Sequence, residues 1–244
     1  MSKTLTIFKR EFASYFATPV AYVFIVFFLI MTGVCTFEIL GFYKSEQASL
    51  QSFFAGHPWL YLILVPALSM RLWAEERRGG TIELLMTLPI SLSASILGKF
   101  LAAWAFTTVT LLLTFPIVLT VNYLGSPDNG AILTGYFGSL LMAGAFLAIG
   151  SCISALTKNQ VIAFILTFAV GLLFNLAGTG LVLKWVPSWV PTEILDALRS
   201  FSFLTHFSAI SRGVLDARDL LFFGSLIGCF LFASAIIVDL RKAD

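Results

Sequence analysis

Six long apolar runs, separated by short polar segments, constrain the fold of this chain more than any other feature. Of its 244 residues, 59% are hydrophobic and 11% are charged, and the mean hydropathy is +0.95. Soluble domains carry about 25% charged residues. A soluble fold could not bury this much apolar surface, so the bilayer must act as the solvent. The predicted membrane-spanning helices are residues 20–40, 58–74, 96–123, 134–156, 161–183 and 220–240.

The spacing of these runs predicts an all-α polytopic membrane protein with six transmembrane helices in a single domain, residues 1–244. No Pro- or Ser-rich linker and no internal repeat divides the chain. The second span is short and contains Pro66, so we expect it to be tilted, kinked or ended early. The third contains Pro116, which predicts another kink.

The amino-terminal segment, residues 1–18, predicts a helix that lies in the membrane interface. Its aromatic and apolar side chains share one face, and Lys3, Lys9 and Arg10 lie on the other. The Lys and Arg residues near the ends of the spans give the orientation. With the amino terminus inside, the cytoplasmic side receives Lys3, Lys9, Arg10, Arg71, Arg77, Arg78, Lys99, Lys158, Arg241 and Lys242. The outer side receives Lys44, Lys184, Arg199, Arg212 and Arg218, so both termini are expected in the cytoplasm.

A long polar interruption, RLWAEERRGGTIELLMTLPISLSASILGK, lies between the second and third spans. Charged residues come first, then Gly79 and Gly80, then a short helix that Thr81 can cap and in which Glu83 suits the positive end of the dipole. Pro89 ends this helix. The pattern predicts a half-apolar helix at the cytoplasmic surface within residues 76–92. By themselves, the charges at 75–78 are typical of the solvated end of a span.

The run EERRGGTIELLMTLPIS, followed by Lys99, resembles the signature of permease subunits of ABC-2 type transporters, closest to the gliding-motility and copper-processing group. The segments FKREFASYFATPVAYVF and ALTKNQVIAF are similar to the same group, and the resemblance covers nearly the whole chain. In that family the surface helix is a coupling helix that contacts a separate ATPase.

The resemblance implies a set of residues that couple this chain to the ATPase. They are Glu76, Arg78, Thr81, Glu83, Leu84, Met86 and Pro89. For Glu76 and Arg78 the expected partner is either the ATPase or the amino-terminal helix. Lys158 and Asn159, in a tight turn between the fourth and fifth spans, form either a second, smaller ATPase contact or a plain loop.

The outer loop, residues 184–219, is expected to contain short helices. Phe201, Phe203, Leu204 and Phe207 are too apolar for an exposed loop and favour a helix on or in the outer leaflet. In the family this region holds short re-entrant helices. Within the fifth span, Asn175 either bonds another helix or lines a wet path, because a buried amide in lipid needs partners.

The chain carries no motif for catalysis, metal binding or nucleotide binding. It has no HExxH, no GxSxG and no GxxxxGK[ST] phosphate loop. Its three cysteines lack CxxC spacing, and a net charge of +2 is too small to suggest nucleic acid. We therefore expect a non-enzymatic subunit with no cofactor or metal of its own.

The resemblance places ATP and Mg²⁺ in a cytoplasmic ATPase present in two copies. It also implies a second permease, expected to be a copy of this chain, and location in a bacterial inner membrane. An accessory protein, periplasmic or membrane-anchored, is a further expected partner.

Two functions follow from this composition and resemblance. The first is ATP-driven export or extraction of a substrate across the inner membrane. The alternative is a mechanotransmission complex that spends ATP to pull on an envelope partner and moves no substrate. An ion-coupled secondary transporter is disfavoured, because the spans lack mid-span acidic residues and an inverted repeat.

Overall fold

The computed structural model describes residues 3–80, 91–177, 179 and 199–240, and within them the chain is helical without strands. The elements are α1 (Lys3–Phe16), α2 (Pro19–Val34), η1 (Cys35–Ile39), η2 (Phe42–Ser45), α3 (Gln51–Ser69), α4 (Arg71–Gly79), α6 (Leu92–Leu112), α7 (Pro116–Leu124), α8 (Asn129–Leu156), α9 (Gln160–Leu176), α12 (Phe203–Ser211) and α13 (Ala217–Leu240). The all-α polytopic fold class is therefore confirmed.

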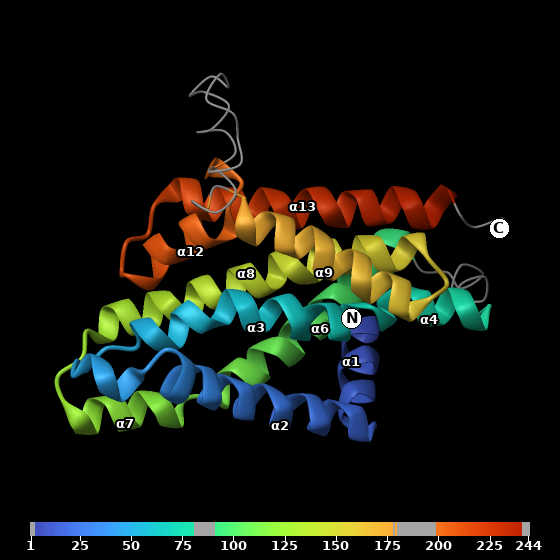
Figure 1. Cartoon of the computed structure of the whole chain (residues 1–244). Coiled ribbons are helices and arrows are strands. Elements are labelled where there is room, and N and C mark those ends of the chain that lie inside the picture. Colours follow the sequence, from blue (N-terminus) through green and yellow to red (C-terminus); the bar gives the residue numbers. More distant parts are fainter. Residues whose placement is uncertain (1–2, 81–90, 178, 180–198, 241–244) are drawn as a thin grey trace, which may run out of the picture.

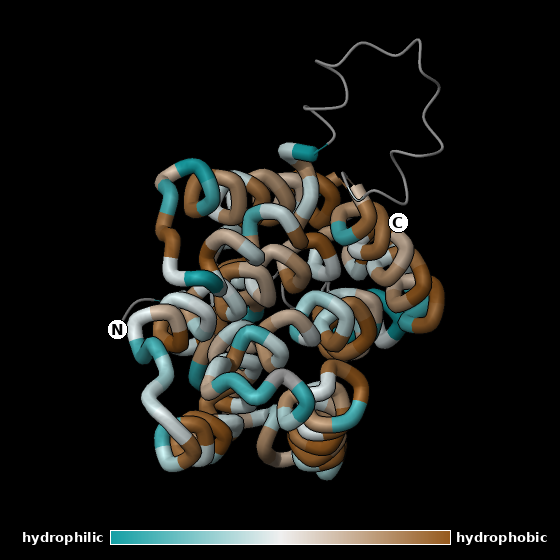
Figure 2. The backbone as a smooth tube through the Cα atoms, turned by 60° about the vertical axis from the view of Figure 1, so that its left-hand side comes forward, coloured by the Kyte–Doolittle hydropathy of each residue, from teal (hydrophilic) through white to brown (hydrophobic). Residues whose placement is uncertain are grey.

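Five stretches of the described chain are long and apolar enough to span a membrane. They are Pro19–Lys44, Gln51–Gly79, Leu92–Leu124, Asn129–Leu156 and Ala217–Leu240. The predicted fifth span corresponds to α9, which is 17 residues long up to Leu176; the rest of the prediction, residues 178 and 180–183, lies outside the described residues. Figure 2 shows hydrophobic residues on peripheral helices as well as inside the bundle, as expected for a protein surrounded by lipid.

The long helices run side by side and form a bundle with two ends (Figure 1). One end holds α1, α4 and the carboxyl terminus of α13, and we call it the α4 end. The other holds α7 and α12, and we call it the α12 end. The predicted amino-terminal helix is observed as α1, which crosses the direction of the spans.

Helix α8 occupies the centre and contacts α3, α4, α6, α9, α12 and α13. Its glycines allow this close packing. A Cβ on Gly150 would lie 2.0 Å from Ser69 Oγ in α3, and one on Gly138 would lie 2.6 Å from Ile210 Cγ2 in α12. The small residues of the fourth predicted span thus serve helix packing, which is how membrane helices approach each other without a hydrophobic driving force.

Pro66 and Pro116 act differently. Pro116 begins α7 after α6 has ended at Leu112, so the helix of the third span breaks where a kink was predicted. Pro66 lies inside α3, which breaks only at Met70. The second span is also longer than predicted. It starts at Gln51 because Phe53 and Phe54, before Pro58, are buried and extend the apolar helix.

In the outer loop, the described part forms α12, whose Phe203 and Phe207 are buried against the bundle. The helix predicted for these phenylalanines is observed, and it packs on α8. Its predicted position on or in the outer leaflet stays a prediction. The first part of the predicted outer loop, residues 184–198, lies outside the described residues.

Candidate functional site

Helix α4 is a short amphipathic helix that leads directly into residues 81–90. Leu72, Trp73 and Arg77 are buried, whereas Glu75 and Arg78 are exposed. The helix ends at Gly80, which adopts a left-handed backbone (φ 67°) that glycine accepts without a steric penalty.

The start of α4 is fixed to the end of α8 by one serine hydroxyl. Ser154 Oγ accepts the backbone N–H groups of Trp73 and Ala74 at 3.1 and 3.0 Å and donates to the carbonyl oxygen of Met70 at 2.9 Å. The first N–H groups of a helix have no partner within the helix. Ser154 therefore acts as a cap supplied by a neighbouring helix.

Two further hydrogen bonds attach the buried face of α4 to α8. Trp73 Nε1 donates to Ser151 Oγ at 3.1 Å, and Arg77 Nη1 donates to the carbonyl oxygen of Ala155 at 2.9 Å. Ala155 lies in the last turn of α8, where a cation is favoured by the helix dipole. Arg77 is only 9% exposed, so it is a structural anchor and not a solvated end charge.

Lys99 joins three helices through its ammonium group. Its Nζ lies 2.7 Å from Glu76 Oε1 in α4 and 3.4 Å from Glu11 Oε1 in α1, while Lys99 itself belongs to α6. Only 6% of its side chain is exposed, and Nζ lies 5.5 Å from the centroid of the Trp73 ring. Arg10 forms a salt bridge with Glu11, so the charges alternate in sign from α1 through α6 to α4. We call Glu11, Glu76 and Lys99 the ionic junction.

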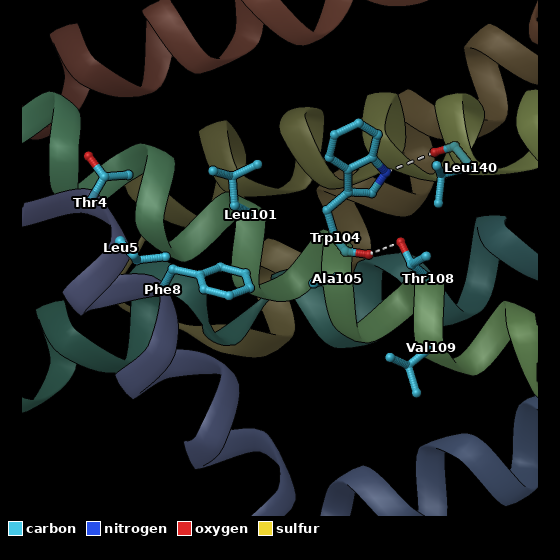
Figure 3. Close-up of a pocket in the computed structure, with 9 residues that line it drawn as sticks. All are labelled: Thr4, Leu5, Phe8, Leu101, Trp104, Ala105, Thr108, Val109 and Leu140. Carbon is cyan, nitrogen blue, oxygen red and sulfur yellow. Dashed lines mark hydrogen bonds between the residues drawn. The ribbon is translucent and has the colours of Figure 1, made fainter. Parts of the chain in front are cut away.

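Helices α1 and α6 approach closely beside the ionic junction. A Cβ on Gly98 would lie 2.7 Å from Ile7 Cγ2, so only glycine leaves room for α1 at this position. Further along the same two helices, Leu5, Phe8 and Leu101 face an apolar groove of about 600 Å³ (Figure 3). The groove also contacts Trp104, whose indole N–H donates to the carbonyl oxygen of Leu140 in α8.

The expected coupling residues fall into two groups. Thr81, Glu83, Leu84, Met86 and Pro89 lie outside the described residues. Among the others, Arg78 is exposed at the end of α4, and Glu76 faces Lys99, which also contacts α1.

The predicted second contact, Lys158 and Asn159, lies at the same end of the bundle, between α8 and α9. Asn159 Oδ1 accepts the backbone N–H of Val161 at 2.9 Å and so caps α9. Lys158 is exposed.

Asn175 lies far from this site, buried in α9. Its amide nitrogen donates to the carbonyl oxygen of Pro58 in α3 at 2.9 Å. A hydrogen bond between helices is one of the two roles that its sequence position allowed. Nearby in α3, His57 Nδ1 lies 2.7 Å from Ser139 Oγ, and the same hydroxyl lies 2.8 Å from the oxygen of Tyr61.

Sequence reasoning did not single out Glu11, Trp73, Arg77, Ser151 or Ser154. One pattern in the sequence could have indicated the two serines. Ser151 and Ser154 are three residues apart in an apolar helix, so they share a face near its end. The pairing of Glu11 with Lys99 joins residues far apart in sequence, which no periodic pattern reveals.

These features define a polytopic helical membrane protein in which three elements meet at an ionic junction next to residues 81–90. A family model described as "ABC-2 family transporter protein" matches residues 5–238. The chain belongs to this family and is a membrane permease subunit of an ABC transporter. A search of curated proteins found no significant match. The likeness to the gliding-motility and copper-processing group remains a prediction.

Proposed function

We propose that this permease couples ATP hydrolysis by a separate cytoplasmic ATPase to the export or extraction of a substrate across a bacterial inner membrane. In this proposal the α4 end faces the cytoplasm, and both termini lie there. The excess of Lys and Arg assigned to that side supports this orientation. ATP and Mg²⁺ belong to the ATPase, which is present in two copies.

The observation that carries the proposal is the three-helix contact of Lys99. Glu76 precedes residues 81–90 by only a few positions, and through Lys99 it is joined to α6 and α1. Ser154 and the Ala155 carbonyl also hold α4 against α8. A force applied at residues 81–90 would therefore reach α1, α6 and α8 together, because polar contacts in a buried site resist separation.

The proposal includes a second permease, expected to be another copy of this chain. Six spans form half a pathway in the family. An apolar surface is available for such pairing, since α9 exposes a row of large side chains. They are Val161, Ile162, Ile165, Leu166 and Leu173. An accessory protein in the periplasm or anchored in the membrane remains an expected partner.

Site-directed cross-linking tests which end of the bundle contacts the ATPase. Arg78→Cys and Ser126→Cys would each be made in a variant that lacks Cys35, Cys152 and Cys229, and the chain would be co-expressed with its ATPase. Both positions are exposed, at opposite ends of the bundle. We expect a cross-link to the ATPase from position 78 only. A cross-link from position 126, or none from 78, would contradict the proposal.

Coupling is tested by charge reversal. We expect Glu83→Lys to uncouple ATP hydrolysis from transport while the protein still inserts and still assembles with the ATPase. Glu46→Lys, at the α12 end, is the matched control and should leave coupling unchanged. ATP hydrolysis that responds to an envelope partner, with no substrate moved into or out of vesicles, would favour the mechanotransmission alternative.

A further inference from the structure

A cavity of about 480 Å³ lies at the α12 end, between the first turns of α3 and the last turns of α12. Its polar lining residues include Gln51, Ser52 and Arg212. Its apolar lining residues include Leu40, Leu204 and Phe207. This volume lies within the range of about 300 to 1,000 Å³ that is typical of small-molecule sites.

The polar lining residues carry side-chain hydrogen-bond donors that have no acceptor among the described residues. Arg212 donates through Nε to the carbonyl oxygen of Ser208 at 2.9 Å, and its two terminal nitrogens have no partner among the described residues. The side-chain amide of Gln51 and the hydroxyl of Ser52 also make no hydrogen bond to any described residue; only the backbone N–H of Gln51 does, to Ser49 Oγ. A cation and two neutral donors thus line the same cavity.

The electrostatics of the cavity favour an anion. Gln51 and Ser52 are the first residues of α3, a helix of 19 residues whose amino-terminal end carries a partial positive charge. No carboxylate lines the cavity. Asp128 lines a smaller hollow that shares Gln51 and Arg212 with the cavity, and its Oδ1 accepts the N–H groups of Gly130 and Ala131.

We propose that this cavity binds an anionic amphiphile, a molecule with one acidic group on an apolar body. The acidic group contacts Arg212, Gln51 and Ser52, and the apolar body packs on Leu204 and Phe207. Such a molecule placed between α3 and α12 would hold α12 in position against the bundle. This inference goes beyond the proposed ATP coupling, and it can be tested on the permease alone.

Binding is measured by native mass spectrometry of the full chain in a neutral detergent, with oleoyl lysophosphatidic acid as the probe. Oleoyl lysophosphatidylcholine tests the need for net negative charge, and inorganic phosphate tests the need for the apolar body. We expect lysophosphatidic acid to bind at least tenfold more tightly than either. Equal binding of all three, or of the two lipids, would overturn the proposal.

Two variants remove the two halves of the site. Arg212→Gln removes the cation, and Ala55→Trp fills the cavity from an exposed wall position. Each should weaken binding of lysophosphatidic acid at least tenfold, whereas Arg212→Lys should retain part of the affinity. Because Arg212 and Ala55 are exposed, the thermal unfolding midpoint should not change, and this measurement verifies that the variants fold.

Matched controls separate this site from general lipid binding. Arg218→Gln removes another exposed arginine from the same end, and Ala105→Trp fills the apolar groove between α1 and α6. Both should leave the affinity unchanged. A loss as large as that of Arg212→Gln or Ala55→Trp would show that binding is not localised here and would contradict the proposal.

The ligand could be a lipid of the membrane or a transported molecule, and purification distinguishes them. An anionic lipid that co-purifies with the wild type after detergent exchange, but not with Arg212→Gln, identifies a resident lipid. A site that is empty on purification but binds the probe identifies an exchanging ligand. Failure of every binding test would leave the proposed ATP coupling intact, since that proposal concerns the opposite end of the bundle.

Discussion

Replacing Lys99 by methionine probes the ionic junction most directly. Methionine keeps the length and apolar stem of the side chain but removes the ammonium group that lies 2.7 Å from Glu76 and 3.4 Å from Glu11. The two carboxylates would then face each other across α4 and α1 with Arg10 as the remaining cation of the set. The substitution thus removes a positive charge from a mostly buried site that holds two carboxylates.

The expected loss in the free energy of unfolding depends on how deeply Glu11 and Glu76 are buried. Removing one member of a fully buried ion pair costs about 3 to 5 kcal/mol, because the remaining charge stays desolvated. The Glu11 and Glu76 side chains are 18% and 19% exposed, so water reaches them in part. We therefore expect Lys99→Met to lower the free energy of unfolding by about 2 to 3 kcal/mol, below that range.

A double-mutant cycle isolates the charge interaction from the loss of packing. Glu76→Gln alone leaves Lys99 with one carboxylate, and the double variant restores the balance of charge. We expect the double variant to be more stable than the sum of the single effects by about 1 to 2 kcal/mol. Equilibrium unfolding in mixed SDS micelles, followed by far-ultraviolet circular dichroism, measures each free energy.

The matched control uses the neighbouring carboxylate. Glu75 is exposed and no ion pair joins it to Lys99 among the described residues, so Glu75→Gln combined with Lys99→Met should be additive. If the Glu76 cycle were also additive, the ionic junction would contribute nothing as a pair, and the reasoning from its geometry would be refuted.

Two further substitutions test how α1 and α4 are held. Gly98→Ala should destabilise the protein by about 1 to 3 kcal/mol, because the added Cβ would collide with Ile7 and push α1 away from α6. A Cβ added at Gly228 meets no atom within 4 Å, so Gly228→Ala should be neutral or stabilising in the same unfolding assay. Ser154→Ala leaves the first amides of α4 without their acceptor, so hydrogen exchange of those amides should accelerate at least tenfold, a change of about 1.4 kcal/mol. Ser225→Ala, which removes only an exposed bond to its own helix, should leave the exchange of α4 unchanged.

The sequence was informative wherever one local pattern decided the structure. Apolar run length predicts the spans, and Pro116 predicts the break between α6 and α7 because a proline cannot donate within a helix. Amphipathic spacing predicts α1. The second span was predicted to begin at residue 58, whereas the buried phenylalanines before it carry α3 back to Gln51.

The site was less predictable, because its partners come from distant parts of the chain. Glu76 could be chosen as a charge at the end of a span, but its partner Lys99 and the contact with Glu11 depend on how α1 packs on α6. Arg77 and Arg78 are adjacent in sequence and have opposite environments, one buried against Ala155 and the other exposed. Only the three-dimensional packing of α4 distinguishes them.

Hydrogen–deuterium exchange of the full chain, with and without its ATPase subunit, tests the central claim most directly. Binding of the ATPase at the α4 end should slow exchange in residues 76–92 and around Lys158 and Asn159. Exchange in residues 125–130, at the α12 end, should not change. Protection confined to the α12 end, or no protection in residues 76–92, would contradict the account.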